Sequence, residues 1–303
     1  MNTRFALIGL PLAAVLLTSC GGSDPFEEDQ DTEGGGGGDG AIVIGSADFP
    51  ESTLLAEIYG RALEAEGVDV EYQLNIGSRE VYYDQIESGA LSLFPEYNGG
   101  ILFYLDPDAE IGDGAETNEA ITEALPDGLE ILDSSSAENK DSVTVTRETA
   151  EEHDLTTIAD LADVAGDMTL GAPPEFETRR QGVPGLESVY GVEFGGFRAL
   201  DAALLTKALS DGDIQAANLF TTDPLIAVED LVVLEDPENL FGAQNITPLI
   251  NTDQVDDQAR DRIDTVSAAL TTEELTRLNE QVMVDNESPA DVAREWLEGE
   301  NLA

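Results

Sequence analysis

The chain contains very little cysteine and histidine. Its 303 residues include one cysteine, Cys20, and one histidine, His153. A single cysteine allows no disulfide within the fold, so packing alone must hold the folded part together. The histidine lies in the charged stretch 151–154, where we expect it to be solvated. This argues against a histidine-based catalytic triad or zinc site.

Familiar catalytic signatures are also absent. The sequence has no Gly-x-Ser-x-Gly elbow and no phosphate-binding loop ending in Lys-Ser or Lys-Thr. The glycine run 34–38 follows no strand, so it is interpreted as a spacer and not as a phosphate cradle. Carboxylates are abundant enough to conceal a catalytic pair, but the sequence favours a binding protein over an enzyme. We expect no catalytic residue, no metal site and no cofactor.

Positive charge is scarce throughout the chain. Thirteen basic residues stand against 64 acidic ones, which gives a formal net charge of −51. Without Arg4 and the seven acidic residues of 21–40, the body still carries 12 − 57 = −45. Such a surface offers nothing to meet phosphates, which excludes nucleic acid as a partner. It repels itself at low salt, whereas at about 1 M salt the screening length falls to about 3 Å, so a salty exterior is predicted.

The one long apolar run lies at the start of the chain. Arg4 precedes 13 apolar residues, Phe5 to Leu17. This run is too short for a committed membrane span and predicts a signal peptide over residues 1–19, and hence export. Residues 20–40 are acidic and Gly-rich, which predicts a flexible tether.

The signal ends in Leu-Thr-Ser-Cys, which resembles a bacterial lipobox. The resemblance implies that Cys20 is lipidated and anchors the protein to the outer face of the cell membrane. The alternative is ordinary cleavage near Ser19 with an incidental cysteine at the next position.

The remaining residues, 41–303, alternate between strand and helix patterns. Short apolar runs at 41–46, 68–77 and 90–97 predict strands, and the segments between them predict helices. This order predicts an α/β fold with mainly parallel sheets and right-handed crossovers.

A second α/β unit begins at residue 141. It contains a predicted short helix at 156–165 and a strand that ends at Phe220. We expect two lobes, 41–142 plus 246–303 and 143–245, with the chain crossing between them twice. The cleft between lobes is the expected place for a small ligand.

Five segments resemble a known protein family. They are GSADF…E, SGALSLFPEYNGG, PPEFETRRQGVPGLESVYG, LSDGDIQAANLFTTDPLI and DLVVLEDPENLFGAQNITPLI, spread in order from about Ile42 to Ile250. Together they resemble the substrate-binding proteins of ABC importers for quaternary amines, the glycine betaine, carnitine and choline group. The resemblance implies a two-lobe, periplasmic-binding-protein-like fold of type II. It also implies, as partners, an ABC transporter permease with its ATPase, and we expect the receptor to be a monomer.

The resemblance also implies ligand-binding residues. In this family a cage of tyrosines holds the trimethylammonium group, and Tyr97 corresponds to the first of them. The other cage tyrosines correspond to Asp141, Phe220 and Gln244. Ring faces suit a quaternary ammonium because it cannot donate a hydrogen bond. Tyr97 could instead be a half-buried loop aromatic, and Asp141 one more surface acid.

The family's carboxylate clamp is also changed. Its lysine corresponds to Ala47 and its threonine to Gly100, and the arginine is kept as Arg179, with Arg180 beside it. Tyr82 or Tyr83 could supply a replacement ring.

These changes predict a cationic or zwitterionic quaternary amine that is bulkier or less carboxylate-dependent than glycine betaine. Choline, carnitine and larger betaines fit this description. Two alternatives stay open: a surface lipoprotein of the same fold with a structural or sensing role, and a receptor for an amino-acid-like solute held by Arg179.

Overall fold

The computed structural model describes residues 40–109 and 112–303. The predicted signal peptide, the tether up to residue 39 and Cys20 therefore lie outside the described residues. Within the described part, no helix combines the length and the apolar character needed to cross a bilayer.

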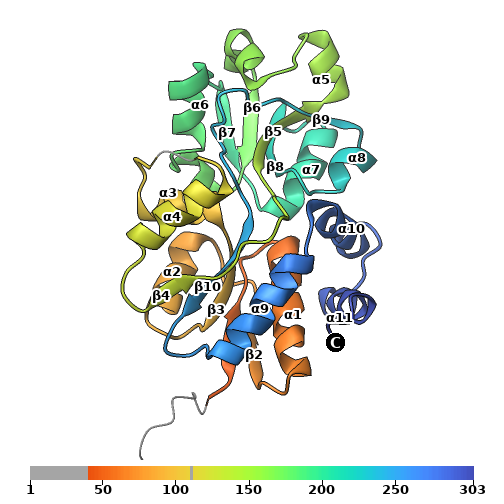
Figure 1. The fold of residues 1–303 in the computed structure, drawn as a ribbon. Helices are drawn as coiled ribbons and strands as arrows, with labels where there is room; N and C mark the ends of the chain where they lie inside the picture. The colour runs from red at the N-terminus through yellow and green to blue at the C-terminus, as the bar shows by residue number, and fades with distance from the viewer. Residues whose placement is uncertain (1–39, 110–111) are drawn as a thin grey trace, which may run out of the picture. The chain divides into compact units, whose positions relative to one another are not determined.

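The first of two five-stranded sheets has the strand order β2-β1-β3-β10-β4 (Figure 1). Its strands are β1 (Ile42–Gly45), β2 (Val70–Gln73), β3 (Leu93–Tyr97), β4 (Leu129–Ile131) and β10 (Ile246–Asn251). The helices around it are α1 (Pro50–Ala65), α2 (Arg79–Glu87), α3 (Asn98–Leu105), α4 (Gly114–Ala124), α9 (Asp257–Ala269), α10 (Thr272–Met283) and α11 (Pro289–Gly299).

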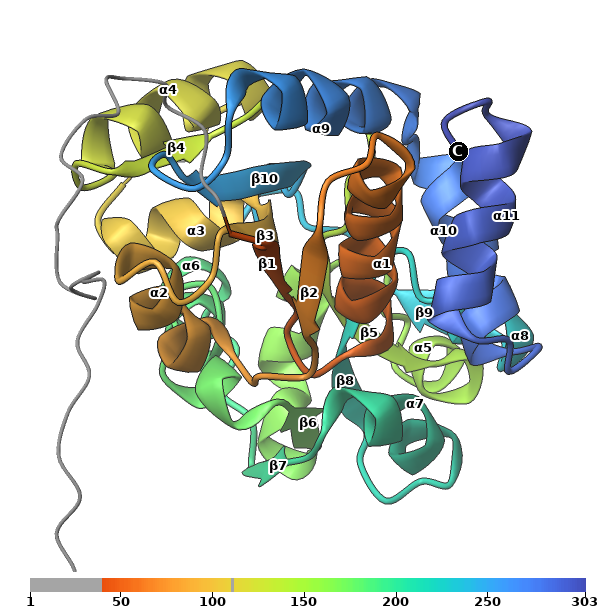
Figure 2. The same ribbon diagram turned by 90° about the horizontal axis from the view of Figure 1, so that it is seen from below.

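Helices cover both faces of this sheet (Figure 2). Helix α1 buries Leu54, Leu55, Ile58 and Leu63 completely, as their helical spacing predicts. They share one core with α9, α10 and α11, including Trp296. On the opposite face, α2, α3 and α4 pack around Phe94 and Leu249. The sheet is therefore held by apolar packing on both sides.

The second sheet has the order β7-β6-β8-β5-β9. Its strands are β5 (Asp141–Thr146), β6 (Thr169–Ala172), β7 (Gly196–Ala199), β8 (Ala216–Phe220) and β9 (Leu231–Val233). Its helices are α5 (Arg147–Glu152), α6 (Val183–Tyr190), α7 (Ala202–Ser210) and α8 (Leu225–Val228), with the short 3₁₀ turns η1 (Ile158–Asp163), η2 (Ala165–Asp167) and η3 (Pro174–Glu177).

Both sheets are mixed: in each, four strands point the same way and one runs antiparallel to them, so the expected mainly parallel arrangement holds with one reversed strand per sheet. β1 is parallel to β2 and β3, but β10 runs antiparallel to β3 and β4. Likewise β6 is parallel to β7 and β8, but β5 runs antiparallel to β8 and β9. The reason is that β5 and β10 carry the chain from one sheet to the other. Each therefore starts at the edge where the neighbouring strand ends and runs the opposite way.

The predicted short helix at 156–165 is present in 3₁₀ form, as η1 and η2. The Asp160 carboxylate accepts hydrogen bonds from the backbone N–H groups of Thr156 and Thr157. Asp160 and Thr157 thereby form a capping box at the start of η1. The proposed division into lobes at residues 142/143 and 245/246 stays a prediction.

Candidate ligand-binding site

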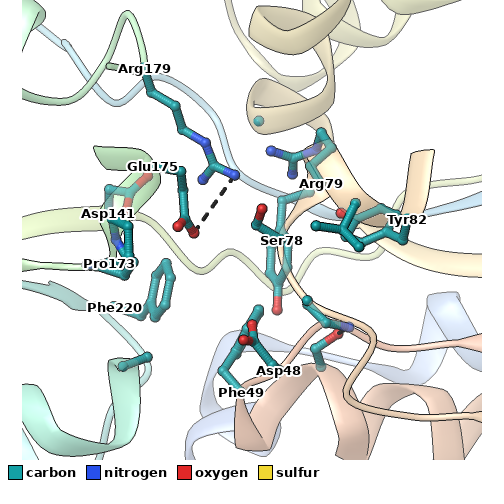
Figure 3. Close-up of a pocket in the computed structure, with 18 of the residues that line it drawn as sticks. Asp48, Phe49, Ser78, Arg79, Tyr82, Asp141, Pro173, Glu175, Arg179 and Phe220 are labelled. Atoms are coloured by element: carbon teal, nitrogen blue, oxygen red, sulfur yellow. Dashed lines mark hydrogen bonds and ion pairs between the residues drawn. The ribbon is translucent and has the colours of Figure 1, made fainter. Parts of the chain in front are cut away.

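A cavity of about 310 Å³ lies where the two sheets face each other (Figure 3). This volume is at the small end of the range for ligand sites. All five predicted ligand-binding residues line it: Tyr97, Asp141, Arg179, Phe220 and Gln244. Ala47 and Gly100, the small residues expected to leave room, line it as well.

Strand register explains how four segments meet at this cavity. Tyr97, the last residue of β3, pairs with Ile246 at the start of β10. Phe220, the last residue of β8, pairs with Asp141 at the start of β5. Residues directly opposite on antiparallel strands share a face of the sheet. The crossing strands thus bring a carboxylate next to an aromatic ring at the mouth of the second sheet.

Three aromatic rings form one side of the cavity. The ring centroid of Phe49 lies 5.3 Å from that of Phe220, at 26° between planes. It lies 6.2 Å from that of Tyr97, at 33°. Sequence reasoning missed Phe49. The signal that could have found it is its place just after β1, at the same end of the parallel strands where Tyr97 was predicted to bind.

A buried carboxylate fixes the hydroxyl of Tyr97. Tyr97 donates to Glu51 Oε1 at 2.6 Å, and Glu51 is only 4% exposed. Burial, and then the negative charge of Glu51, raise the pKa of Tyr97 well above its ordinary value, so the hydroxyl stays protonated. Tyr97 is half-buried and packs against the core of the first sheet. Its ring is therefore held in one orientation.

Acidic groups outnumber basic ones along the cavity wall. Asp48, Asp141 and Glu175 line it. The Asn218 Nδ2 group donates to Asp141 Oδ1 at 3.0 Å. Burial raises the pKa of Asp141, while this hydrogen bond and the charges of Arg179 and Arg79 oppose the rise. A cation near Asp141 would favour its charged form.

Arg179 reaches across from the second sheet to the first. It follows η3 and pairs with Glu80 of α2 through Nε–Oε1 at 3.1 Å and Nη2–Oε2 at 3.0 Å. A second carboxylate, Glu175, lies 3.9 Å from Nη2 (Figure 3). Burial opposes ionisation of Glu80, but the hydrogen bonds and charge of Arg179 outweigh it and lower the pKa of Glu80 to about 2. The guanidinium of Arg179 is thus already paired with protein carboxylates.

Its neighbour Arg180 has a different place. The Arg180 guanidinium carbon lies 4.4 Å from the ring centroid of Phe103, and Arg180 lines an adjoining hollow. Of the two arginines, only Arg179 lines the main cavity.

The side-chain amide of Gln244 bonds to backbone groups. Its Oε1 accepts from the backbone N–H of Gly100 at 3.0 Å, and its Nε2 donates to the carbonyl of Phe241 at 2.8 Å. Gln244 is 3% exposed. Although it lines the cavity, its visible role is to hold the first turn of α3 in place.

Of the two tyrosines considered as replacement rings, Tyr82 lines the cavity. Its ring stacks on Phe94 with centroids 3.7 Å apart and its hydroxyl donates to Glu96 at 2.7 Å. Tyr83 is buried beside Tyr104 and is not among the residues that line this cavity.

Sequence reasoning also missed Arg79, the first residue of α2. It lines the cavity and is 8% exposed. Its Nε and Nη2 donate to the fully buried Glu96 at 2.9 and 2.7 Å. Burial opposes the charge on Arg79, but Glu96 outweighs it and raises the pKa of Arg79. No motif signalled this pair, because helix and strand positions 17 residues apart meet only in the fold.

Across residues 40–109 and 112–303, no cluster of three or more His, Cys, Asp or Glu side chains could hold a metal ion.

The chain is similar to known proteins over most of its length. Residues 40–299 match the family described as the substrate-binding domain of the ABC-type glycine betaine transport system. The chain is 27% identical over 272 residues to the glycine betaine-binding protein YehZ of Escherichia coli (strain K12), covering 84% of this chain and 89% of that protein. It is 24% identical over 275 residues to the carnitine transport binding protein OpuCC of Listeria monocytogenes, covering 88% and 89%.

The fold has close structural counterparts. The crystal structure of a glycine betaine/carnitine/choline ABC transporter superposes with a TM-score of 0.69 at 24% identity, covering 86% of this chain and 99% of that one. The expected α/β fold of the periplasmic-binding-protein type is thereby confirmed, with one reversed strand, β10 or β5, in each sheet.

Proposed function

Because the chain belongs to the family of substrate-binding domains of ABC-type glycine betaine transport systems, we propose that its cavity captures a quaternary-amine compatible solute. Glycine betaine, choline, carnitine and related betaines are the candidates. Members of this family are solute-binding proteins of ABC importers, not enzymes, and they work outside the cytoplasm. This receptor would hand its solute to a permease and its ATPase.

The observation that supports this proposal is the group of Phe49, Tyr97 and Phe220 beside Asp141 in one cavity. Each ring face contributes about 0.5–2 kcal/mol to holding a desolvated quaternary ammonium. The nearby carboxylate adds direct charge attraction, which is stronger in a cleft than in bulk water. Gln244 completes the wall on the side of α3.

The charges favour a solute that does not depend on a carboxylate. Arg179 and Arg79 are each paired with a glutamate, while Asp48, Asp141 and Glu175 add negative charge to the same cavity. A ligand carboxylate would have to compete with Glu80 for Arg179. We therefore place choline and other cationic amines ahead of compact zwitterions and of amino-acid-like solutes.

We also propose that Cys20 carries a lipid, that residues 20–40 form the tether, and that the receptor acts as a monomer. Incorporation of labelled fatty acid into the wild-type protein, and its loss in Cys20→Ser, is the expected result. Labelling that persists in the variant would contradict the anchor.

A melting titration in about 1 M salt tests the proposed function. Choline, carnitine, glycine betaine and the neutral carbon isostere of choline are compared on the purified protein. A true ligand at 100 times its Kd should stabilise the fold by about 2.7 kcal/mol, and the neutral isostere should do far less.

Two substitutions at one position provide the control. Tyr97→Leu removes the ring face and should weaken binding by about 2- to 30-fold, whereas Tyr97→Phe keeps the ring and should lose less. If none of the amines stabilises the protein, the cage proposal fails. The structural or sensing role would then be the next candidate.

A further inference from the structure

The position of the Arg79 guanidinium is fixed by its partners. Two of its nitrogens, Nε and Nη2, donate to both oxygens of Glu96, and the same carboxylate accepts from the Tyr82 hydroxyl and the Tyr97 backbone N–H. Glu96 is 0% exposed. Bidentate pairs of this kind fix the plane of the guanidinium. Arg79 is therefore a rigid group and not a mobile surface arginine.

The remaining nitrogen of the Arg79 guanidinium is Nη1. Arg79 Nη1 has no hydrogen-bond partner among residues 40–109 and 112–303. Arg79 lines the cavity and is 8% exposed, so part of its side chain reaches the open space. Figure 3 shows the guanidinium of Arg79 turned toward that of Arg179. Because Arg79 lines the cavity, this fixed donor is available to a ligand there.

Gly100 makes room for this arginine. A Cβ atom on Gly100 would lie 2.7 Å from Arg79 Nη2 and 3.2 Å from both Cζ and Nη1. Gly100 cannot retreat easily, because its N–H bonds to Gln244 and the neighbouring Gly99 already lies against the carbonyl of Ala243. Gly100 stands where the family's carboxylate clamp has a threonine. The glycine therefore removes that hydroxyl group and also leaves room for the guanidinium of Arg79.

Arg79 lies across the cavity from the rings of Phe49 and Phe220 (Figure 3). In Figure 3, Arg79 and Arg179 lie on the opposite side of the cavity from Phe49 and Phe220. An ammonium group at the rings would direct the other end of the ligand toward Arg79. Because Glu96 neutralises the charge of Arg79, the group offers a directed hydrogen bond and does not demand an anion.

We propose that Arg79 is a specificity-determining residue that contacts the ligand through Nη1. It selects quaternary amines that carry an oxygen acceptor, either hydroxyl or carboxylate, a short chain away from the nitrogen. This inference rests on the proposed function and adds the chemical group recognised at the far end of the cavity. Gly100 and Glu96 act as positioning residues for the guanidinium.

A ligand series on the wild-type protein provides the first test. Choline and glycine betaine are compared by calorimetric titration with ethyltrimethylammonium, which is choline without its hydroxyl group. The wild type should prefer at least one oxygen-bearing ligand by about tenfold, the effect of one hydrogen bond from a charged donor. Equal affinities would overturn the role of Arg79 and leave the quaternary-amine proposal standing. If none of the three binds and carnitine does not bind either, the proposed function itself fails.

Two variants then locate the donor. Gly100→Ala displaces the guanidinium without removing the buried ion pair, and Arg79→Lys keeps the charge but loses the planar donor. In both variants, the ratio of the affinity for the oxygen-bearing ligand to that for ethyltrimethylammonium should fall close to one. The affinity for ethyltrimethylammonium itself should change little. Arg147→Lys is the matched control, since Arg147 forms a similar two-bond pair with Asp230 on the surface.

The outcomes of the variants are decisive in either direction. A preference that persists in both Gly100→Ala and Arg79→Lys places the donor elsewhere and overturns the inference. Equal weakening of all three ligands would indicate a structural role only and would also overturn it. Should Arg79→Lys fail to fold, Gly100→Ala together with the wild-type series still decides the question.

Discussion

At the scale of single residues, the charge of Asp141 carries a cost in the free protein, because burial disfavours it. It lies beside Phe220 and accepts a hydrogen bond from Asn218 at 3.0 Å. Burial raises its pKa, which means that its ionised form is less favourable in the folded protein than in the unfolded chain. A cation bound at the rings would offset that unfavourable term.

We therefore predict opposite effects of Asp141→Asn on binding and on stability. Asparagine can still accept from Asn218, so melting of the ligand-free protein should stay the same or rise slightly near neutral pH. Affinity for choline should fall on the order of tenfold, while binding of its neutral isostere stays unchanged. In the wild type, affinity for the cation should fall as the pH drops through the raised pKa of Asp141. Titration of both proteins across acidic pH measures this, and identical profiles would contradict the role of Asp141.

At the scale of elements, Glu51 joins four segments that are remote in sequence. Its Oε1 accepts from Tyr97 at the end of β3 and from Asn139 before β5, both at 2.6 Å. Its Oε2 accepts from Thr222 after β8 and from Asn279 of α10, both at 2.5 Å. This buried carboxylate is thus stabilised by four hydrogen bonds from uncharged donors. The start of α1 thereby links both sheets, a crossing segment and a C-terminal helix.

Glu51→Gln should consequently destabilise the fold and loosen the Tyr97 ring. A glutamine has one acceptor oxygen, so two of the four donors would face an NH₂ group. Each buried donor left without an acceptor costs about 1–3 kcal/mol. Chemical unfolding measures the change in the free energy of unfolding. Glu57→Gln on the same helix is the control, because Glu57 pairs mainly with Arg61, and it should cost less. Equal costs for the two variants would refute a special role of Glu51.

At the scale of the whole molecule, negative charge dominates. Eleven of the 12 basic side chains in residues 41–303 lie within 4.0 Å of a carboxylate, and the twelfth, Arg180, lies over Phe103. The 57 acidic residues of the body are too numerous to be paired by them. Salt weakens these ion pairs but also screens the repulsion among the remaining carboxylates. Exposed pairs contribute only about 0–1 kcal/mol each. The repulsion among carboxylates should therefore decide whether salt stabilises or destabilises the fold.

We predict that raising salt from about 0.1 to about 1 M increases the melting temperature, because the screening length falls from about 10 to about 3 Å. Melting curves in both sodium and potassium chloride measure the effect and show whether it follows ionic strength alone. A melting temperature that falls with salt would contradict the interpretation of the acidic surface as an adaptation to a salty exterior.

The sequence by itself determined the α/β class, the family and the position of Tyr97. Those inferences depend on local order: a buried strand, a Pro-Glu-Tyr end and a helix start are all contiguous in the chain. It also indicated Asp141, Phe220 and Arg179 through family resemblance, and all three line the cavity. Their contribution to binding stays a prediction.

Only the tertiary structure decided the direction of β5 and β10, the contact of Phe49 with Phe220, and the partners of Glu51 and Arg79. Glu51 and Asn279 lie 228 positions apart, and no periodicity or spacing in the chain relates them. Similarly, Arg79 owes its place to the space left by Gly100 and to the fully buried Glu96. Such contacts depend on which side chains converge when the two sheets meet, and that convergence is a property of packing.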